Sequence, residues 1–83
     1  MKDVRIYTTR VCPYCLMAKR LLDSRGIAYQ EINVSDSDTR ERIARESGWR
    51  TVPVIYIGDE LVGGYNELAD LDRAGRLLAM TGA

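Results

Sequence analysis

Histidine is absent from this chain of 83 residues, and its absence already narrows the possible chemistry. Histidine is the commonest general base and metal ligand in proteins, so a hydrolase or a zinc enzyme is disfavoured. No apolar run approaches the length of a membrane span, and residues 1–5 alternate in charge instead of forming the apolar core of a signal peptide. The sequence therefore predicts a cytoplasmic protein with no membrane partner.

An excess of charge of either sign is also missing. The chain has 12 Lys and Arg residues and 12 Asp and Glu residues, so its net charge is zero. No general attraction to nucleic acid follows from such a balance, and no nucleic-acid partner is expected. With 46% hydrophobic and 29% charged residues, the composition is that of a folded globular protein. The length predicts one domain over residues 1–83, and we expect a monomer.

Cysteine is scarce, and the two cysteines of the chain stand close together in Cys12-Pro13-Tyr14-Cys15. A β-rich run over residues 4–8 precedes them and a helical pattern follows. Two cysteines separated by two residues at a strand-to-helix junction are typical of a thioredoxin-like redox site. The chain offers no second pair and no histidine to complete a zinc site. Redox chemistry is therefore favoured over a metal bridged between two chains, and no metal is expected.

The two cysteines are expected to have different roles. Cys12 falls at the first turn of the helix, where unpaired backbone N–H groups and the helix dipole favour the reactive thiolate. Cys15 lies three residues later, on the same helical face but further inside. We therefore interpret Cys12 as the attacking sulfur and Cys15 as the resolving one. Pro13 suits the first helical position, and Arg10 is the closest cation in the sequence.

The remaining pattern predicts an α/β fold of the minimal thioredoxin type, with a four-stranded mixed sheet and three helices. The first two strands and the helix between them form a right-handed βαβ unit, and a turn at Gly58-Asp59 makes a hairpin. The final helix is expected to be capped by Asn66 and broken by Gly75, which leaves a short last turn over residues 77–80. The expected order β-α-β-α-β-β-α places strands at 4–8, 28–34, 51–57 and 60–62 and helices at 16–23, 39–47 and from 66 onward.

Four features, in this order, resemble the glutaredoxin family. Ile6-Tyr7-Thr8 precedes the Cys-Pro-Tyr-Cys sequence, and Thr51-Val52-Pro53 and then Gly63-Gly64 follow it. From the pattern alone, Pro53 would be an ordinary strand-edge proline and Gly63-Gly64 a turn. Their combination is similar to the short bacterial dithiol glutaredoxins, and the likeness extends from about residue 4 to about residue 75.

This resemblance implies glutathione as the reducing co-substrate and a binding groove around Cys12. It also implies a cis peptide bond between Val52 and Pro53, which would present the Val52 backbone to an extended peptide such as glutathione. The glycine pair 63–64 would let the glutathione backbone approach closely. The N–H groups at Tyr65-Asn66 would face the γ-glutamyl carboxylate.

The chain also departs from the family pattern at two charged positions. Thr9 stands where many members have a lysine, so Arg10 or Arg50 would have to meet the glycyl carboxylate. Asn66 stands where the family usually has an acidic residue that holds the γ-glutamyl ammonium, and Glu67 or Asp70 would have to substitute. Trp49 belongs either to the core or to the groove wall. The expected glutathione-binding residues are Arg10, Tyr14, Arg50, Thr51, Val52, Pro53, Gly64, Tyr65 and Asn66.

The expected function is that of a thiol–disulfide oxidoreductase, which reduces protein disulfides and glutathionylated proteins through Cys12. Cys15 would resolve intermediates with protein substrates, whereas Cys12 alone should suffice for glutathionylated ones. Two alternatives stay open. The first is a redoxin reduced by thioredoxin reductase instead of glutathione. The second is a glutathione-ligated [2Fe–2S] scaffold, against which Pro13 and Cys15 argue.

Overall fold

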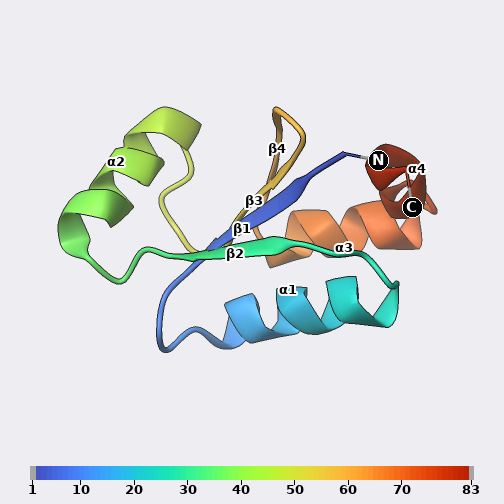
Figure 1. Cartoon of the computed structure of the whole chain (residues 1–83), viewed down its shortest axis with the longest axis horizontal. Coiled ribbons are helices and arrows are strands. Elements are labelled where there is room, and N and C mark those ends of the chain that lie inside the picture. The colour runs from blue at the N-terminus through green and yellow to red at the C-terminus, as the bar shows by residue number, and fades with distance from the viewer. Residues whose placement is uncertain (1, 83) are drawn as a thin grey trace.

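The computed structural model describes residues 2–82, and a four-stranded sheet forms its centre (Figure 1). The strand order is β2-β1-β3-β4. β1 pairs with β2 in parallel and with β3 antiparallel, and β3 pairs antiparallel with β4. The strands are β1 (Val4–Thr8), β2 (Gln30–Asn33), β3 (Val54–Ile57) and β4 (Glu60–Gly63). The helices are α1 (Pro13–Ser24), α2 (Ser37–Ser47), α3 (Tyr65–Arg73) and α4 (Leu77–Thr81). The predicted fold class is confirmed.

The main core lies between the sheet and the helices α1 and α3, and α1 lies below the sheet in Figure 1. Ile6 and Ile55 of the sheet pack there against Leu22 of α1 and Leu68 of α3, and all four are fully buried. Strand alternation places the next residues on the other face, where a smaller cluster forms around Tyr7. The members of that cluster are Tyr7, Val34, Ile43 and Val54.

The helix α2 stands apart at one end of the sheet in Figure 1 and buries only Ile43 of its own residues. Its ends match the sequence signals. The Asp36 side chain caps the first turn by accepting from the Thr39 N–H at 3.0 Å, and Gly48 ends the helix with a φ of 72°. This carboxylate is bonded by backbone N–H groups, which lowers the pKa of Asp36.

Several boundaries differ from the sequence-based expectation. β3 begins at Val54 rather than at residue 51, because the cis peptide bond before Pro53 and its missing N–H keep that segment out of the ladder. The predicted cap at Asn66 is wrong, because α3 begins at Tyr65 and Gly64 is its N-cap. The last turn is a helix of its own, α4, so the described chain has four helices rather than three.

No helix within residues 2–82 is long and apolar enough to cross a membrane.

Candidate active site

The cysteine pair lies where the chain leaves the end of β1 and enters α1. Cys12 is the N-cap of α1 in an extended conformation, Pro13 takes the first helical position, and the sulfurs of Cys12 and Cys15 form a disulfide. The Cys15 backbone N–H donates to Cys12 Sγ at 3.1 Å. Cys15 is only 2% exposed, whereas Cys12 is half-buried. An incoming thiol or disulfide can therefore reach the sulfur of Cys12 but not that of Cys15.

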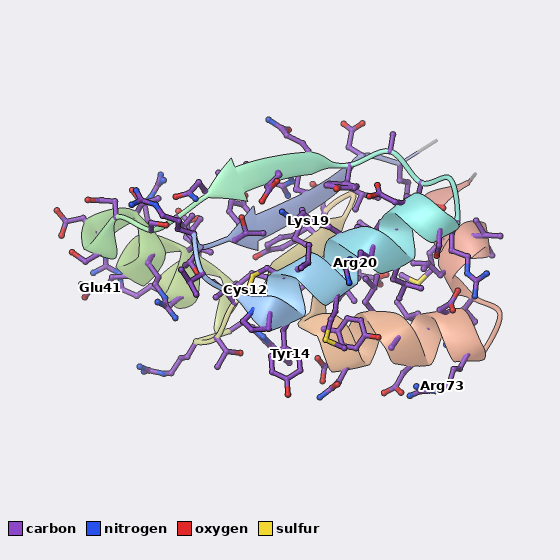
Figure 2. The ribbon with its side chains drawn as sticks, turned by 90° about the horizontal axis from the view of Figure 1, so that it is seen from below. Cys12, Tyr14, Lys19, Arg20, Glu41 and Arg73 are labelled. Carbon is purple, nitrogen blue, oxygen red and sulfur yellow. A yellow bond between two sulfur atoms is a disulfide. The ribbon has the colours of Figure 1, made fainter. Side chains whose placement is uncertain are left out.

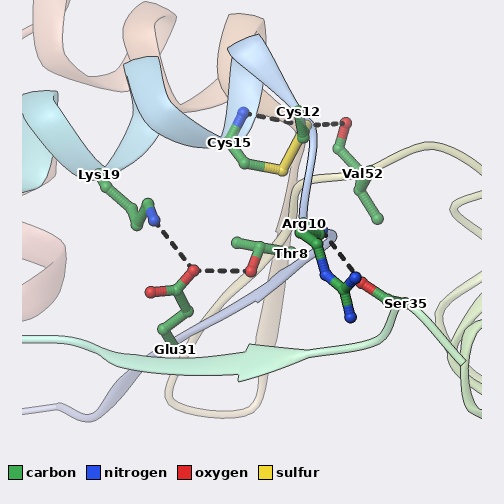
Figure 3. The surroundings of a disulfide bond; sticks show 8 residues. All are labelled: Thr8, Arg10, Cys12, Cys15, Lys19, Glu31, Ser35 and Val52. Atoms are coloured by element: carbon green, nitrogen blue, oxygen red, sulfur yellow. Dashed lines mark hydrogen bonds and ion pairs between the residues drawn. A yellow bond between two sulfur atoms is a disulfide. The ribbon is translucent and has the colours of Figure 1, made fainter.

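The loop before β3 comes up against Cys12 from the other side. Cys12 Sγ lies 3.7 Å from the Val52 carbonyl oxygen (Figure 3). The peptide bond between Val52 and Pro53 is cis, as the resemblance predicted, and Pro53 is buried beneath it. The half-buried Cys12 therefore sits directly beside a stretch of backbone that takes part in none of the described strand pairings.

A groove of about 320 Å³ opens next to this contact, between the loop at residues 49–53 and the start of α3. Tyr14 and Tyr65 both line it, with their ring centroids 6.4 Å apart. A larger hollow of about 820 Å³ lies near Lys2 and Gly58, but no residue from Cys12 to Cys15 lines it, whereas Tyr14 lines the smaller groove. The smaller groove is therefore the site that borders the disulfide loop. Its lining residues are Tyr14, Trp49, Thr51, Val52, Pro53, Gly64, Tyr65, Asn66 and Glu67.

Seven of the nine predicted binding residues thus come together, but the two arginines do not line this groove. The Arg10 backbone N–H donates to Ser35 Oγ at 3.0 Å, and its exposed side chain extends along that side of the loop (Figure 3). Arg50 is exposed and borders a small hollow beside Arg40 and Ile43 of α2. The only charged side chain among the residues that line the groove is that of Glu67, which is acidic.

Glu67 is one of two acidic residues that the sequence offered near the start of the last helix, and the structure separates them. Glu67 Oε1 accepts from the Gly64 N–H at 3.0 Å and lines the groove. Asp70 lies one turn further along α3, outside the groove, and pairs with Arg73. Of the two, only Glu67 can meet a ligand in the groove.

Trp49 is a groove residue whose place the sequence left undecided. Its indole ring packs over Gly63, where an added Cβ would lie 2.9 Å from the ring, and over Gly64, where the distance to Nε1 would be 3.4 Å. Gly63 also has a φ of 116°, which favours glycine. The glycine pair therefore makes room for the chain's own tryptophan. The buried Nε1 of Trp49 has no hydrogen-bond partner within residues 2–82.

A polar network that sequence reasoning missed lies on the sheet side of the disulfide (Figure 3). The buried Thr8 hydroxyl donates to Glu31 Oε2 at 2.7 Å, and Lys19 Nζ of α1 lies 3.0 Å from the same oxygen. These two contacts, the Thr8 hydrogen bond foremost, lower the pKa of Glu31. The network ties the first turns of α1 to both β1 and the edge strand β2, directly behind the cysteines. Spacing along the chain gave no signal for it.

Comparison with known proteins gives one consistent family. The glutaredoxin family model matches residues 4–62. A glutaredoxin of Pseudomonas aeruginosa is 46% identical over the full length of both chains, and glutaredoxin 3 of Escherichia coli K12 is 42% identical over 93% of this chain and 94% of its own.

Solved structures agree with these relatives. The solution structure of glutaredoxin from Brucella melitensis has a TM-score of 0.85 at 42% identity, and covers 100% of this chain and 94% of that one. A buckwheat glutaredoxin in complex with glutathione has a TM-score of 0.89 at 29% identity, and covers 98% of this chain and 77% of that one. The disulfide-forming pair, the cis proline beside it and these matches lead to one conclusion: the chain belongs to the glutaredoxin family of thiol–disulfide oxidoreductases.

Proposed function

We propose that this protein is a cytoplasmic, monomeric oxidoreductase that uses glutathione to reduce protein disulfides and glutathionylated proteins. One observation carries the proposal: half-buried Cys12, at the N-terminus of α1, lies 3.7 Å from the Val52 carbonyl beside an open groove. The relative from buckwheat, which was solved with glutathione, supports the same ligand.

The reaction begins at Cys12 of the reduced protein. Its thiolate attacks a substrate disulfide, forms a mixed disulfide and releases the other substrate sulfur as a thiol. With a protein substrate, Cys15 attacks Cys12 Sγ, which frees the reduced substrate and closes the Cys12–Cys15 disulfide. One glutathione thiolate then opens that disulfide at Cys12. A second attacks the resulting mixed disulfide, so that glutathione disulfide leaves and both cysteines return as thiols.

With a glutathionylated substrate the route is shorter. Cys12 takes over the glutathione and releases the protein thiol, after which one further glutathione regenerates Cys12. Cys15 is not required on this route, and its burial keeps it away from the incoming glutathione.

The groove would hold glutathione as an added strand beside Val52, whose backbone N–H and C=O would pair with the peptide. Thr51 and Pro53 would form one wall, with Tyr14 and Tyr65 flanking the sulfur.

The two ends of glutathione would meet different groups. The first N–H groups of α3, at Tyr65 and Asn66, would meet the γ-glutamyl carboxylate, and Glu67 would hold the ammonium. Arg10 and Arg50 would reach the glycyl carboxylate only from outside the groove, since neither lines it.

The test is turnover of a small glutathione mixed disulfide coupled to glutathione reductase, for wild type and Cys15→Ser side by side. Both proteins should turn over, and Cys12→Ser should be inactive. Equal loss in the two variants would contradict the division of roles between the cysteines. If the wild type fails here but accepts electrons from thioredoxin reductase, glutathione is not its reductant.

A further inference from the structure

Large apolar side chains that stay exposed are concentrated around the cysteines. Among residues 2–82, four of the five such residues fall within positions 11–17, and the fifth is Leu78 of α4. Exposed apolar groups scattered singly are ordinary, whereas a group of them at one place marks an interaction surface. The exposed fractions are 87% for Val11, 57% for Tyr14, 46% for Leu16 and 42% for Met17.

The arrangement of α1 explains why Leu16 and Met17 share one surface. Cys15, Ala18 and Leu22 take the buried side of the helix, so Leu16 and Met17 fall on the outer side of its first turns. Arg20 is exposed and stands one turn after Leu16, on the same side. Figure 2 shows Arg20 on the outer side of α1, with Cys12 and Tyr14 at the start of the helix. We call Val11, Leu16, Met17 and Arg20 the cysteine rim.

The stretch of chain that carries the cysteines has charge of one sign, although the chain as a whole is neutral. Positions 10–20 contain Arg10, Lys19 and Arg20 and no acidic residue. Lys19 is paired with Glu31, whereas Arg10 and Arg20 have no ion pair within residues 2–82. The groove on the other side of Tyr14 has no basic lining residue and one acidic residue, Glu67. The two sides of the site therefore differ in charge as well as in shape.

We propose that the cysteine rim docks the protein part of the substrate, and that it favours extended segments whose target cysteine stands among apolar and acidic residues. The inference rests on the proposed function, because glutathione would fill the groove and leave the opposite side of Cys12 to the polypeptide. Apolar substrate side chains would pack on Val11, Leu16 and Met17, and an acidic one would face the unpaired guanidinium of Arg20. The rim adds no chemical step; it raises the local concentration of one class of disulfide at Cys12 Sγ.

The experiment compares three substrates of the full-length protein. Two are synthetic peptides with one glutathionylated cysteine each, flanked by Leu and Asp in the first and by Ser and Lys in the second. The third is a small glutathione mixed disulfide with no peptide, which contacts the groove alone. The proteins are wild type, Arg20→Glu, Met17→Ser and, as the matched control, Arg76→Glu in the turn between α3 and α4. Thermal unfolding of each variant confirms that it is folded.

For wild type, kcat/KM should be higher for the peptide with Leu and Asp (the acidic peptide) than for the peptide with Ser and Lys. This preference should shrink as ionic strength rises from about 0.01 M to about 1 M, because the Debye length falls from about 30 Å to about 3 Å. Arg20→Glu should lower kcat/KM for the acidic peptide by about three- to tenfold, and Met17→Ser should lower it by about threefold. Arg76→Glu should leave kcat/KM unchanged for both peptides.

Turnover of the small mixed disulfide separates two kinds of failure. If wild type does not turn it over, the proposed function is wrong. If it does, but both peptides react equally at low ionic strength or Arg20→Glu behaves like Arg76→Glu, the docking proposal alone is overturned.

Discussion

The backbone N–H of Cys15 donates a hydrogen bond to the sulfur of Cys12 at 3.1 Å, so the buried cysteine helps to position and polarise the half-buried one. This contact exists because Cys12 is the N-cap of α1 and Cys15 occupies the third helical position, whose N–H has no partner inside the helix. The two residues therefore share one structural unit but present very different sulfurs to the solvent.

Alkylation of the single-cysteine variants should show that difference. In Cys15→Ser the remaining Cys12 should react with iodoacetamide about tenfold faster or more than the remaining Cys15 does in Cys12→Ser, because accessible thiolates at helix N-termini react and buried thiols do not. Mass spectrometry over time measures both rates under native conditions. Similar rates in the native state would contradict the assignment, and equal rates after unfolding are the control.

Gly63→Ala should destabilise the protein by about 2–4 kcal/mol, because it combines an unfavourable positive φ with an added Cβ 2.9 Å from the Trp49 ring. The matched control is Gly75→Ala, which has a φ of 71° and nothing within 4 Å of the new Cβ. Gly75→Ala should lower the free energy of unfolding only by the cost of the positive φ, about 1–2 kcal/mol. Urea unfolding gives both values. Equal losses of stability in the two variants would show that the Trp49 ring moves away from the new Cβ without destabilising the fold.

Glu31→Gln should reduce stability at neutral pH but not in strong acid. The pKa of Glu31 is lowered in the folded protein by Thr8 and then Lys19, so its carboxylate stabilises the fold above the unfolded pKa of about 4.3. That contribution is lost as the pH falls through the lowered folded pKa. Urea unfolding across this pH range should show the curves of wild type and Glu31→Gln converging at low pH.

The same comparison in a Lys19→Met background is the control for the cause. Without the ammonium group 3.0 Å from Glu31 Oε2, the loss of stability that Glu31→Gln causes at neutral pH should be smaller. A loss that keeps its size would leave the Thr8 hydroxyl as the whole cause.

Glu67→Gln should raise KM for a small glutathione mixed disulfide about tenfold and leave kcat nearly unchanged, because on the proposed binding mode the lost charge would contact the ligand and not the reacting sulfur. Asp70→Asn is the matched control and should leave both constants unchanged, since Asp70 does not line the groove. Steady-state kinetics coupled to glutathione reductase measures both. A fall in kcat with constant KM would contradict a pure binding role.

Trp49 should report ligand binding directly, because it is the only tryptophan in the chain and lines the groove. S-methylglutathione cannot undergo thiol exchange, so its addition should change the tryptophan emission in a saturable way. Glu67→Gln should move the midpoint to higher concentration and leave the end point similar. An emission spectrum that does not respond while turnover is normal would place the ligand away from Trp49.

The sequence alone was enough for the redox chemistry and most of the fold. Cys12 and Cys15 stand three residues apart in the chain, and the local rules of a helix N-terminus predict different roles for them without tertiary information. Hydrophobic periodicity located the strands and helices, with errors at ends where Pro53 or Gly64 altered the pairing or the cap.

Only the tertiary structure decided which residues share the groove. Glu67 was separated from Asp70, and the tryptophan was placed on the glycine pair, by the packing of α3 against the loop at residues 49–53. Arg10 and Arg50 do not line the groove, because the Arg10 backbone is bonded to Ser35 and Arg50 borders a hollow beside α2. The physical reason is that sequence distance constrains neighbours within one helix or turn, whereas contacts such as Thr8 with Glu31 depend on how separate elements pack in three dimensions.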